Sequence, residues 1–189
     1  MNWLPPTLET ERLVIRPLEE RDATGIFLFC SNPNVTKFTL WDTHRTIEDS
    51  LFFVRQYAPS RYLDRVPEPM GLVLKNDPDQ MVMGTIGCFW SSQSDGVMEM
   101  GYNVAELCWG RGLAVEAARR MIEHVFQEYP VFRLQIRTFK ENTGSARVAQ
   151  KLGFHLDGTL RSAVIRYGQR RDLEIYSLLR GENSSSDSL

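Results

Sequence analysis

The clearest pattern in the chain is one helical face in its second half. Between Gly112 and Gln127 the apolar residues fall in neighbouring pairs, at positions 113/114, 117/118, 121/122 and 125/126. Because an α-helix turns once in about 3.6 residues, a spacing of four places these pairs on one face. The pattern therefore predicts an amphipathic helix whose apolar face packs in a core.

Shorter apolar runs separated by turn residues predict strands along much of the remaining chain. Asn76-Asp-Pro-Asp79 and Asp95-Gly96 are two such turns, made of residues that favour tight backbone bends. A third turn, Tyr167-Gly-Gln169, separates the last two runs. The strands are expected at residues 13–16, 70–75, 81–90, 97–104, 132–138, 154–166 and 171–179.

Three further helices are predicted from residues that typically begin or end a helix. Asp22 is expected to be the N-cap of a helix that runs to about residue 30. Thr46-Ile-Glu-Asp49 has the form of a capping box and predicts a helix to about residue 57. Asn142–Leu152 is expected to be a shorter helix that ends at Gly153. Strands and helices alternate in the second half, which predicts an α/β fold with one mixed sheet and helices on its faces.

Composition changes this picture little, but it excludes some functions. The 189 residues suit a single domain, and a net charge of -2 gives no overall field for nucleic acid or an anionic membrane. The near-neutral total hides a basic segment, since Arg133–Asp172 carries nine Lys/Arg against three Asp/Glu. The chain ends in the polar stretch Gly181–Leu189, of which residues 183–189 are expected to be a disordered tail, which leaves about residues 8–182 for the domain.

Neither a membrane span nor a metal or disulfide framework is predicted. No apolar run approaches the roughly 18 residues that a spanning helix needs, and the three cysteines form no CxxC pair. His44, His124 and His155 are scattered, and none has a second ligand at metal spacing. Cys108 has no neighbouring base and is expected to be inert. We therefore expect a soluble, reduced, cytoplasmic protein.

The segment that indicates chemistry is Trp109-Gly-Arg-Gly-Leu-Ala114, between an expected strand and the amphipathic helix. Glycines at such a turn let backbone N–H groups approach a ligand closely, and a helix N-terminus carries about half a positive charge. A phosphate group is therefore the natural ligand. On these residues alone, a simple tight turn explains the segment equally well.

Known phosphate-binding and nucleophile motifs fit this segment poorly. A P-loop is excluded because no Gly-Lys-Ser/Thr follows the first glycine at the required spacing. A dinucleotide fold fits in part, through Gly110, Gly112 and an Arg137 that could favour a 2′-phosphate, but Val115 occupies the third glycine position. An NADP-dependent oxidoreductase therefore stays open as an alternative. The Gly-x-Ser-x-Gly nucleophile elbow of many hydrolases does not occur.

Four motifs, in this order along the chain, resemble the GNAT acetyltransferases. They are Glu99-Met-Gly-Tyr-Asn-Val104, Trp109-Gly-Arg-Gly-Leu-Ala-Val-Glu-Ala117, Asn142-Thr-Gly-Ser145 and Lys151-Leu-Gly-Phe154. The opening Leu8-Glu-Thr-Glu-Arg-Leu13 and the closing Tyr176-Ser-Leu-Leu-Arg180 are similar to the RimJ/RimL-type branch, which acetylates N-terminal amines of ribosomal proteins and related substrates. The resemblance covers about residues 8–182. It implies a mixed, mostly antiparallel sheet of about seven strands, with two splayed central parallel strands and helices on both faces.

The resemblance also implies where acetyl-CoA binds. The GNAT signature Gln/Arg-x-x-Gly-x-Gly/Ala is matched by Gly112 and Ala114, whereas Trp109 stands in place of Gln or Arg. Arg147 and Lys151, one helical turn apart, could face the cofactor phosphates together, or could belong to a solvated helix face. The other residues implied to bind the cofactor are Tyr102, Asn103, Val104, Gly110, Arg111, Leu113, Asn142 and Ser145.

Direct acetyl transfer to an amine needs a group that accepts a proton. A free α-amine has a pKa of about 7.7–8.0, so at neutral pH it is mostly protonated. Glu99 is the candidate base, with a solvated glutamate at a strand edge as the alternative. By resemblance, Ser145 is the candidate acid for the departing thiolate, and a backbone N–H near Asn103–Val104 stabilises the oxyanion. Ser145 could instead bond backbone at its helix start, and further candidate acids are Tyr102, Tyr167 and Tyr176.

The acceptor is the least determined part of the prediction. By resemblance, the aromatic stretch Phe38–His44, with Trp41 inside it, and the following helix form one wall of the acceptor site. A hydrophobic anchor beneath a loop would also explain these rings. The first hypothesis is an N-acetyltransferase acting on a peptide N-terminus or, failing that, a small-molecule amine. A catalytically silent CoA-binding sensor is the second, and the chain could be a monomer or a homodimer.

Overall fold

The computed structural model describes residues 3–182. By the contacts within it, the chain divides into two compact units. The first comprises the described residues up to Phe89 together with Tyr102–Met121, and the second comprises Trp90–Gly101 together with the described residues from Ile122 onward. The expected disordered tail, residues 183–189, lies outside the described residues. None of the helices in the described range is long and apolar enough to cross a membrane.

The first unit contains an antiparallel run of strands. Each of β1, β2 and β3 pairs antiparallel with the next strand along the chain. The end of β5 lies beside β4, because the Ala105 N–H donates to the Met83 carbonyl at 2.8 Å. The strands are β1 (Leu8–Glu9), β2 (Leu13–Pro17), β3 (Met70–Leu74), β4 (Val82–Ser92) and β5 (Val97–Val104), the last two shared with the second unit.

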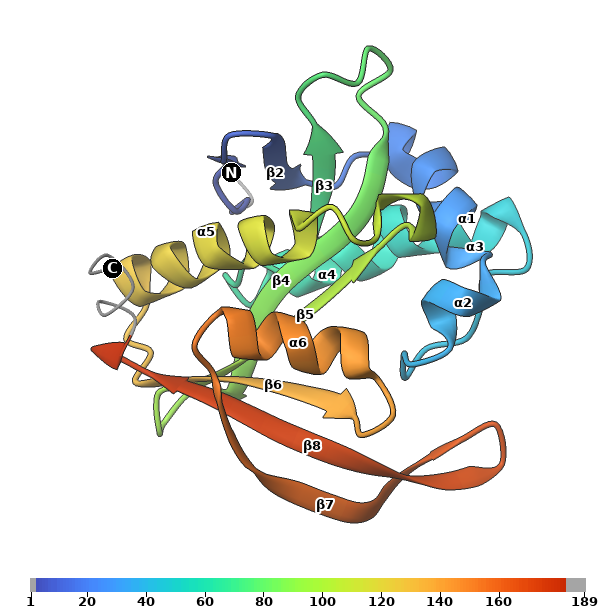
Figure 1. The fold of residues 1–189 in the computed structure, drawn as a ribbon. Helices are drawn as coiled ribbons and strands as arrows, with labels where there is room; N and C mark the ends of the chain where they lie inside the picture. Colours follow the sequence, from blue (N-terminus) through green and yellow to red (C-terminus); the bar gives the residue numbers. More distant parts are fainter. Residues whose placement is uncertain (1–2, 183–189) are drawn as a thin grey trace. The chain divides into compact units, whose positions relative to one another are not determined.

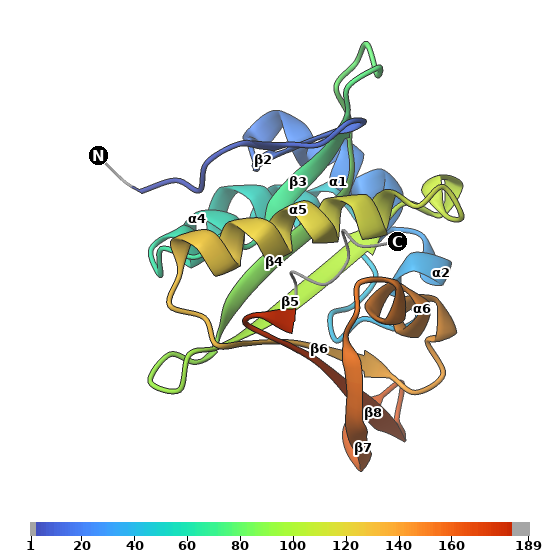
Figure 2. The ribbon, with the colours of Figure 1, turned by 60° about the vertical axis from the view of Figure 1, so that its left-hand side comes forward.

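Helices cover both faces of these strands. The beginning of α5 (Leu113–Glu128) lies on one face of β3 and β4, and α1 (Ala23–Cys30) and α4 (Ala58–Tyr62) lie on the other (Figure 2). Tyr62 fixes α4 to the strands, since its hydroxyl donates to the Pro69 carbonyl at 2.5 Å and accepts from the Leu18 N–H at 3.0 Å. The other helices of this unit are η1 (Glu20–Asp22), α1 (Ala23–Cys30), α2 (Pro33–Thr36), α3 (Ile47–Phe52), η2 (Phe53–Tyr57), α4 (Ala58–Tyr62) and η3 (Glu106–Cys108).

The amphipathic helix is confirmed as α5. Leu113, Ala117, Met121 and Val125 are each no more than 1% exposed. The pairing of apolar residues therefore identified the buried face correctly.

Asp22 is the N-cap residue of α1, as predicted, but its side chain makes no capping hydrogen bond to that helix. The chain enters the helical region three residues earlier, with Glu19 as N-cap of a 3-10 turn that leads into α1. Asp22 has helical backbone angles, and its carboxylate accepts from the Glu19 N–H at 2.7 Å. The same carboxylate binds both Nη atoms of Arg16, at 2.7 and 2.8 Å. A bidentate arginine on the preceding strand therefore decides where this carboxylate points.

The capping box at Thr46 and Asp49 is confirmed, but the helix does not end near Tyr57. Helical backbone continues through the π-helical segment η2 into α4. The Ala58 N–H bonds the Phe53 carbonyl, which widens the helix just before Pro59. Because Pro59 has no N–H to donate, a wider turn at this point lets the helix continue.

The second unit contains the parallel strands. β5 pairs in parallel with β6 (Arg133–Phe139), in a register that joins Val97 to Arg133 and Glu99 to Gln135. Among the described residues this ladder ends at Glu99, although both strands run on, as expected for a splayed pair. β6 and β7 (His155–Arg166) each pair antiparallel with β8 (Gln169–Leu179), and α6 (Thr143–Lys151) lies beside β6 (Figure 1).

The strand order is β1-β2-β3-β4-β5-β6-β8-β7, in one mixed sheet of eight strands. The predicted fold class is confirmed, including the parallel pair in the middle of the order. The sheet has eight strands rather than about seven, because the two-residue strand β1 is too short to leave a pattern in the sequence.

Candidate active site

The glycine loop has the backbone shape that only glycine adopts readily. Gly110 has φ +74° and Gly112 has φ +77°. A Cβ at Gly110 would meet no atom within 4 Å, so the requirement for glycine there is conformational and not steric. The residues Gly110–Gly112 are exposed, and a ligand can approach their backbone.

The loop leads into the N-terminus of α5 with its amide groups available. The Glu116 N–H donates to the Gly112 carbonyl at 3.0 Å and closes the first turn. The N–H groups of Leu113, Ala114 and Val115 precede that bond, so they have no partner within the helix. Three such amides at the positive end of a sixteen-residue helix form a cradle that fits a pyrophosphate.

Trp109 connects the loop to the end of β5. Its indole Nε1 donates to the Val104 carbonyl at 2.8 Å, while the side chain stays 51% exposed. The tryptophan that stands in place of Gln or Arg in the signature therefore bonds the backbone of the strand that precedes the loop.

Arg12 binds the loop and the first turn of α5 together. Its Nη1 donates to the Arg111 carbonyl at 3.0 Å, and its Nε donates to Glu116 Oε2 at 2.6 Å. Glu116 Oε1 also accepts from the Arg12 N–H at 2.9 Å and from the Thr10 hydroxyl at 2.5 Å. Burial raises the pKa of Glu116, but the hydrogen bonds from Thr10 and Arg12 outweigh it and leave that pKa below its usual value.

Glu106 connects η3 to α2. Its carboxylate accepts from the Asn32 amide at 2.7 Å and from the Asn34 amide at 2.9 Å. These two bonds lower the pKa of Glu106. Neither Glu106 nor the Arg12–Glu116 pair was predicted from the sequence as part of the site, although Arg12 lies in the opening motif and Glu116 in the loop motif.

On the neighbouring strands Asn103 is fixed by Thr85. The Asn103 amide nitrogen donates to the Thr85 hydroxyl at 2.9 Å. The Asn103 Oδ1 is buried and has no hydrogen-bond partner among the described residues. Tyr102 is half-buried and Val104 is buried, so the three residues implied to contact the cofactor line the end of β5.

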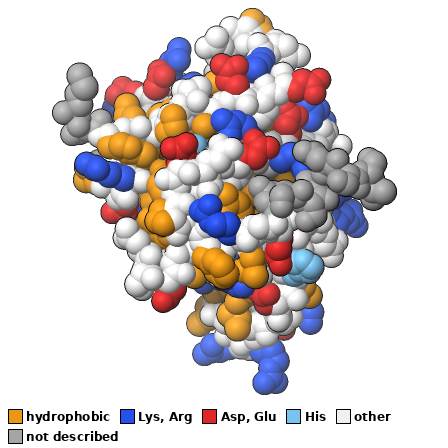
Figure 3. Space-filling model, turned by 90° about the vertical axis from the view of Figure 1, so that its left-hand side faces the viewer, with side chains coloured by type: hydrophobic (Ala, Val, Ile, Leu, Met, Phe, Trp, Pro, Cys, Tyr) orange, Lys and Arg blue, Asp and Glu red, His pale blue; other side chains and the backbone are white. Residues whose placement is uncertain are grey.

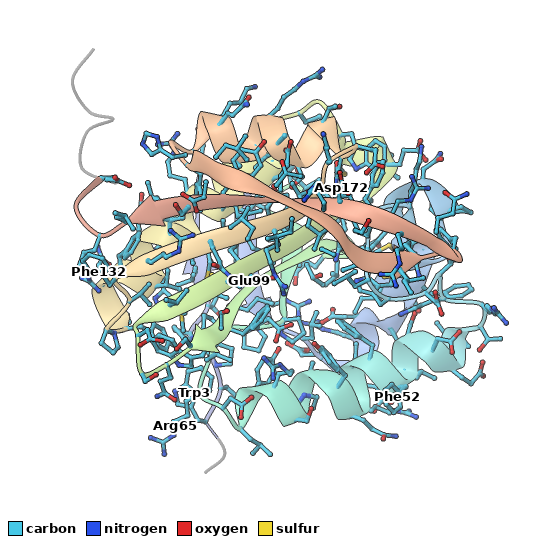
Figure 4. The ribbon with its side chains drawn as sticks, turned by 90° about the horizontal axis from the view of Figure 1, so that it is seen from below. Trp3, Phe52, Arg65, Glu99, Phe132 and Asp172 are labelled. Atoms are coloured by element: carbon cyan, nitrogen blue, oxygen red, sulfur yellow. The ribbon has the colours of Figure 1, made fainter. Side chains whose placement is uncertain are left out.

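Glu99 belongs to the second unit and is not a solvated glutamate. Its side chain is 12% exposed, and its Oε2 accepts from Arg137 Nε at 2.7 Å and from Gln135 Nε2 at 3.2 Å. Figure 4 shows it on β5. Both donors come from β6 and reach the same oxygen, which leaves Oε1 as the oxygen that could accept a proton.

Asn142 and Ser145 meet at the start of α6. Asn142 is the N-cap, and its Oδ1 accepts from the Ser145 N–H at 3.2 Å. Ser145 is half-buried. Arg147 and Lys151 are exposed on the same helix, four residues apart.

Some arginines of the basic segment bind carboxylates. Arg133 binds Asp157, Arg137 binds Glu99 and Arg171 binds Glu141. Other basic side chains lie on the β7–β8 hairpin, the lowest part of Figure 1, where Figure 3 shows Lys and Arg side chains gathered at the bottom of the view. The basic charge of this segment is therefore not concentrated at α6 alone.

A row of aromatic rings runs from the Phe38–His44 stretch along the helix that follows it. Ring centroids are 5.7 Å apart between Trp41 and His44, and 6.4 Å between His44 and Phe53. Phe53 and Tyr57 stack at 5.2 Å within the π-helical segment. The rings pack on one another, and Tyr57 stays 39% exposed.

One histidine and the three cysteines have defined surroundings. His44 Nδ1 bonds the Ser50 hydroxyl at 2.7 Å. The three cysteines are free and buried, and burial raises the pKa of the Cys108 thiol. Among the described residues, no group of three His, Cys, Asp or Glu could hold a metal ion.

Comparison with known proteins identifies the family to which this chain belongs. The family profile described as "Acetyltransferase (GNAT) domain" matches residues 12–155. The chain belongs to the GNAT acetyltransferase family. It is an acetyltransferase, and the co-substrate of this family is acetyl-CoA. The NADP-dependent alternative is not favoured, and Arg137, on which it partly rested, binds Glu99.

Two curated relatives of this GNAT enzyme come from Bacillus subtilis (strain 168). The "Uncharacterized N-acetyltransferase YoaA" is 27% identical over 175 residues, which cover 93% of this chain and 97% of YoaA. The "Putative ribosomal N-acetyltransferase YdaF" is 29% identical over 177 residues, 92% of this chain and 87% of YdaF.

Solved structures share the fold of this GNAT enzyme. The Microcin C7 self immunity acetyltransferase MccE, in complex with acetyl-CoA and AMP, superposes with a TM-score of 0.81 at 20% identity, over 93% of this chain and 98% of MccE. RimL, a ribosomal L7/L12 alpha-N-protein acetyltransferase in complex with coenzyme A, gives 0.77 at 15% identity, over 92% of this chain and 98% of RimL.

Proposed function

We propose that this chain transfers an acetyl group from acetyl-CoA directly to a primary amine, and that the acceptor is a protein or peptide N-terminus of the RimJ/RimL type. The glycine loop at the head of α5 carries the cofactor half of this proposal, since it offers three free amides beside two residues with positive φ. The acceptor half is supported by the opening and closing motifs and by the similarity to YdaF, named as a putative ribosomal N-acetyltransferase, and to RimL, a ribosomal L7/L12 alpha-N-protein acetyltransferase. A small-molecule amine is the second candidate acceptor.

In this proposal, backbone groups bind most of the cofactor. The amides of Gly110–Val115 bind the pyrophosphate, and the backbone of Tyr102–Val104 bonds the pantetheine amides as an added strand would. Asn142 and Ser145 contact the cofactor from the start of α6. Arg147 and Lys151 attract its phosphates, and their exposure on one helix face supports that role.

The reaction forms the N–C bond and breaks the C–S bond without a covalent enzyme intermediate. Glu99 takes the amine proton through Oε1, directly or through water, and its half-buried, oriented carboxylate supports this role. A backbone N–H at Asn103–Val104 stabilises the tetrahedral oxyanion. Ser145 supplies a proton to the departing thiolate. Positioning of the amine against the thioester provides much of the acceleration.

We further propose that residues 8–182 act as one catalytic domain in the cytoplasm, as a monomer or homodimer. The family profile spans parts of both compact units, which supports a single functional domain. Three free, buried thiols are typical of a reducing compartment.

A screen for acetylation tests this function. Thiol release from acetyl-CoA is measured with panels of N-terminal peptides, free amino acids, polyamines and aminoglycosides, and products are confirmed by mass spectrometry. We expect turnover with peptides that have a free α-amine and none with the same peptides blocked at the N-terminus. Turnover confined to small amines would overturn the acceptor, and tight acetyl-CoA binding without any turnover would identify a sensor instead.

A further inference from the structure

Arg12, between β1 and β2, bonds both the glycine loop and the first turn of α5. We propose that Arg12 is a positioning residue for acetyl-CoA binding: it fixes the shape of the glycine loop and neutralises Glu116 beside the phosphate cradle. This inference rests on the proposed cofactor role of that loop. Its partners, Arg111 and Glu116, lie 99 and 104 residues away along the chain.

The first part of the argument concerns the direction of one peptide group. The Arg111 carbonyl lies between the two positive-φ glycines, where the backbone has most freedom to rotate. A trans peptide is planar, and its C=O and the following N–H point in opposite directions. By binding the Arg111 oxygen at 3.0 Å, Arg12 therefore also aims the Gly112 N–H away from itself, toward the exposed side of the loop.

The second part concerns charge. A carboxylate in the first turn of α5 favours the helix dipole, but it would repel an incoming pyrophosphate. Glu116 accepts from the Arg12 guanidinium, the Arg12 backbone and Thr10, which occupies both of its oxygens. The guanidinium cancels the negative charge where the phosphates would otherwise meet it.

Fold stability alone does not explain the bond from Arg12 to the loop. The Arg12 side chain is 44% exposed, and an ion pair at such a site usually contributes little to folding. The same guanidinium also bonds a loop carbonyl that belongs to no helix or strand. A role in shaping the loop accounts for both bonds.

Calorimetric titration with acetyl-CoA tests the proposal in four variants of the full chain. Arg12→Ala removes both contacts and is expected to raise the Kd about tenfold, in line with the loss of hydrogen bonds to a charged group. Arg12→Lys keeps the positive charge but loses the several N–H donors of the guanidinium, so its acetyl-CoA Kd should lie between the wild-type and Arg12→Ala values. In the double variant Arg12→Ala/Glu116→Gln, loss of the unpaired carboxylate should bring the Kd part of the way back. Arg21→Ala removes an exposed arginine that binds only Glu19 in the described structure, and should leave the Kd unchanged.

A purely structural role for Arg12 would not produce this partial recovery of acetyl-CoA affinity in the double variant. Removing a second contact would then weaken binding further. An Arg12→Ala Kd within twofold of wild type overturns the proposal. A double variant no better than Arg12→Ala overturns its charge component. If Arg12→Ala shows no cooperative thermal unfolding, the acetyl-CoA Kd of Arg12→Lys is the test instead. An Arg12→Lys Kd equal to that of wild type then overturns the proposal. Failure of the proposed function is a separate outcome, since the wild-type chain would then not turn over.

Discussion

Glu99 is oriented by two donors that reach the same oxygen. Arg137 and Gln135 both bond Oε2, so the carboxylate is fixed through that oxygen. A general base must be within hydrogen-bond reach of the proton that it takes, and a fixed side chain meets that condition better than a free one.

The variant Glu99→Gln tests the base directly. The amide has the same shape and can still accept from Arg137, but it cannot take a proton. We expect kcat to fall about a hundredfold, the lower end for general-base catalysis, with the acetyl-CoA Kd unchanged. The measurement is steady-state thiol release across pH. Asp157→Asn is the matched control, because Asp157 is also an arginine-paired carboxylate of the second unit. Equal kcat values and equal pH profiles for wild type and Glu99→Gln would remove this role.

Glu116 should make stability depend on acid pH. Its pKa in the folded chain is lowered, so its contribution is fully present above the unfolded value of about 4.3 and is lost as the pH falls through the folded pKa. The Tm difference between wild type and Glu116→Gln should therefore be constant from neutral pH down to about pH 5 and shrink below it. A difference that does not change with pH would show that the carboxylate is not the group responsible.

Single residues also show which site features a sequence can reveal. Gly110 and Gly112 were identifiable because glycine at a strand-to-helix turn indicates positive φ from local chemistry alone. Arg12 was not, because its partners lie about a hundred residues away and the pattern around it describes only a strand. Asp22 was placed correctly at the start of α1, but the sequence did not show that its carboxylate binds Arg16 and the Glu19 N–H instead of the first turn of that helix.

At the level of elements, strong periodicity predicted well and subtle backbone geometry did not. The face of α5 and the capping box at Thr46 follow from the residue types themselves. The π-helical segment before Pro59 does not, since a proline normally indicates a helix end. The strand β1 has two residues and is fixed by pairing with β2, a contact that the sequence does not display.

The loop between β5 and α5 can be tested through its backbone. Gly110→Ala introduces a Cβ where φ is +74°, at a conformational cost of about 1–2 kcal/mol, although no atom would clash. We expect the loop to leave its binding shape and the acetyl-CoA Kd to rise about tenfold. Gly168→Ala is the matched control, with φ +71° and equally open surroundings in the β7–β8 turn. Both variants should lower the Tm by similar amounts, but Gly168→Ala should leave the acetyl-CoA Kd unchanged. A rise in Kd for both variants would show that the effect is not specific to the glycine loop.

At the scale of the whole molecule, the positive charge of this near-neutral chain is unevenly distributed along the sequence. The net charge is -2, yet Arg133–Asp172 is strongly basic. Three of its arginines form ion pairs with Glu99, Asp157 and Glu141. The exposed cations of α6 and of the β7–β8 hairpin are then two groups in this segment that could attract an anionic ligand.

Charge reversal separates these two groups. Arg147→Glu with Lys151→Glu on α6 should raise the acetyl-CoA Kd about tenfold at low salt, and the loss should shrink as salt screens the phosphates. Arg161→Glu with Arg170→Glu changes the net charge equally but acts on the hairpin, where both residues are exposed. That control should leave the Kd near the wild-type value. Calorimetry at about 0.05 and 0.5 M salt gives both numbers, since the Debye length falls severalfold over this range. If both double variants weaken binding alike, total charge governs cofactor affinity, and the proposed role of α6 in contacting the phosphates is wrong.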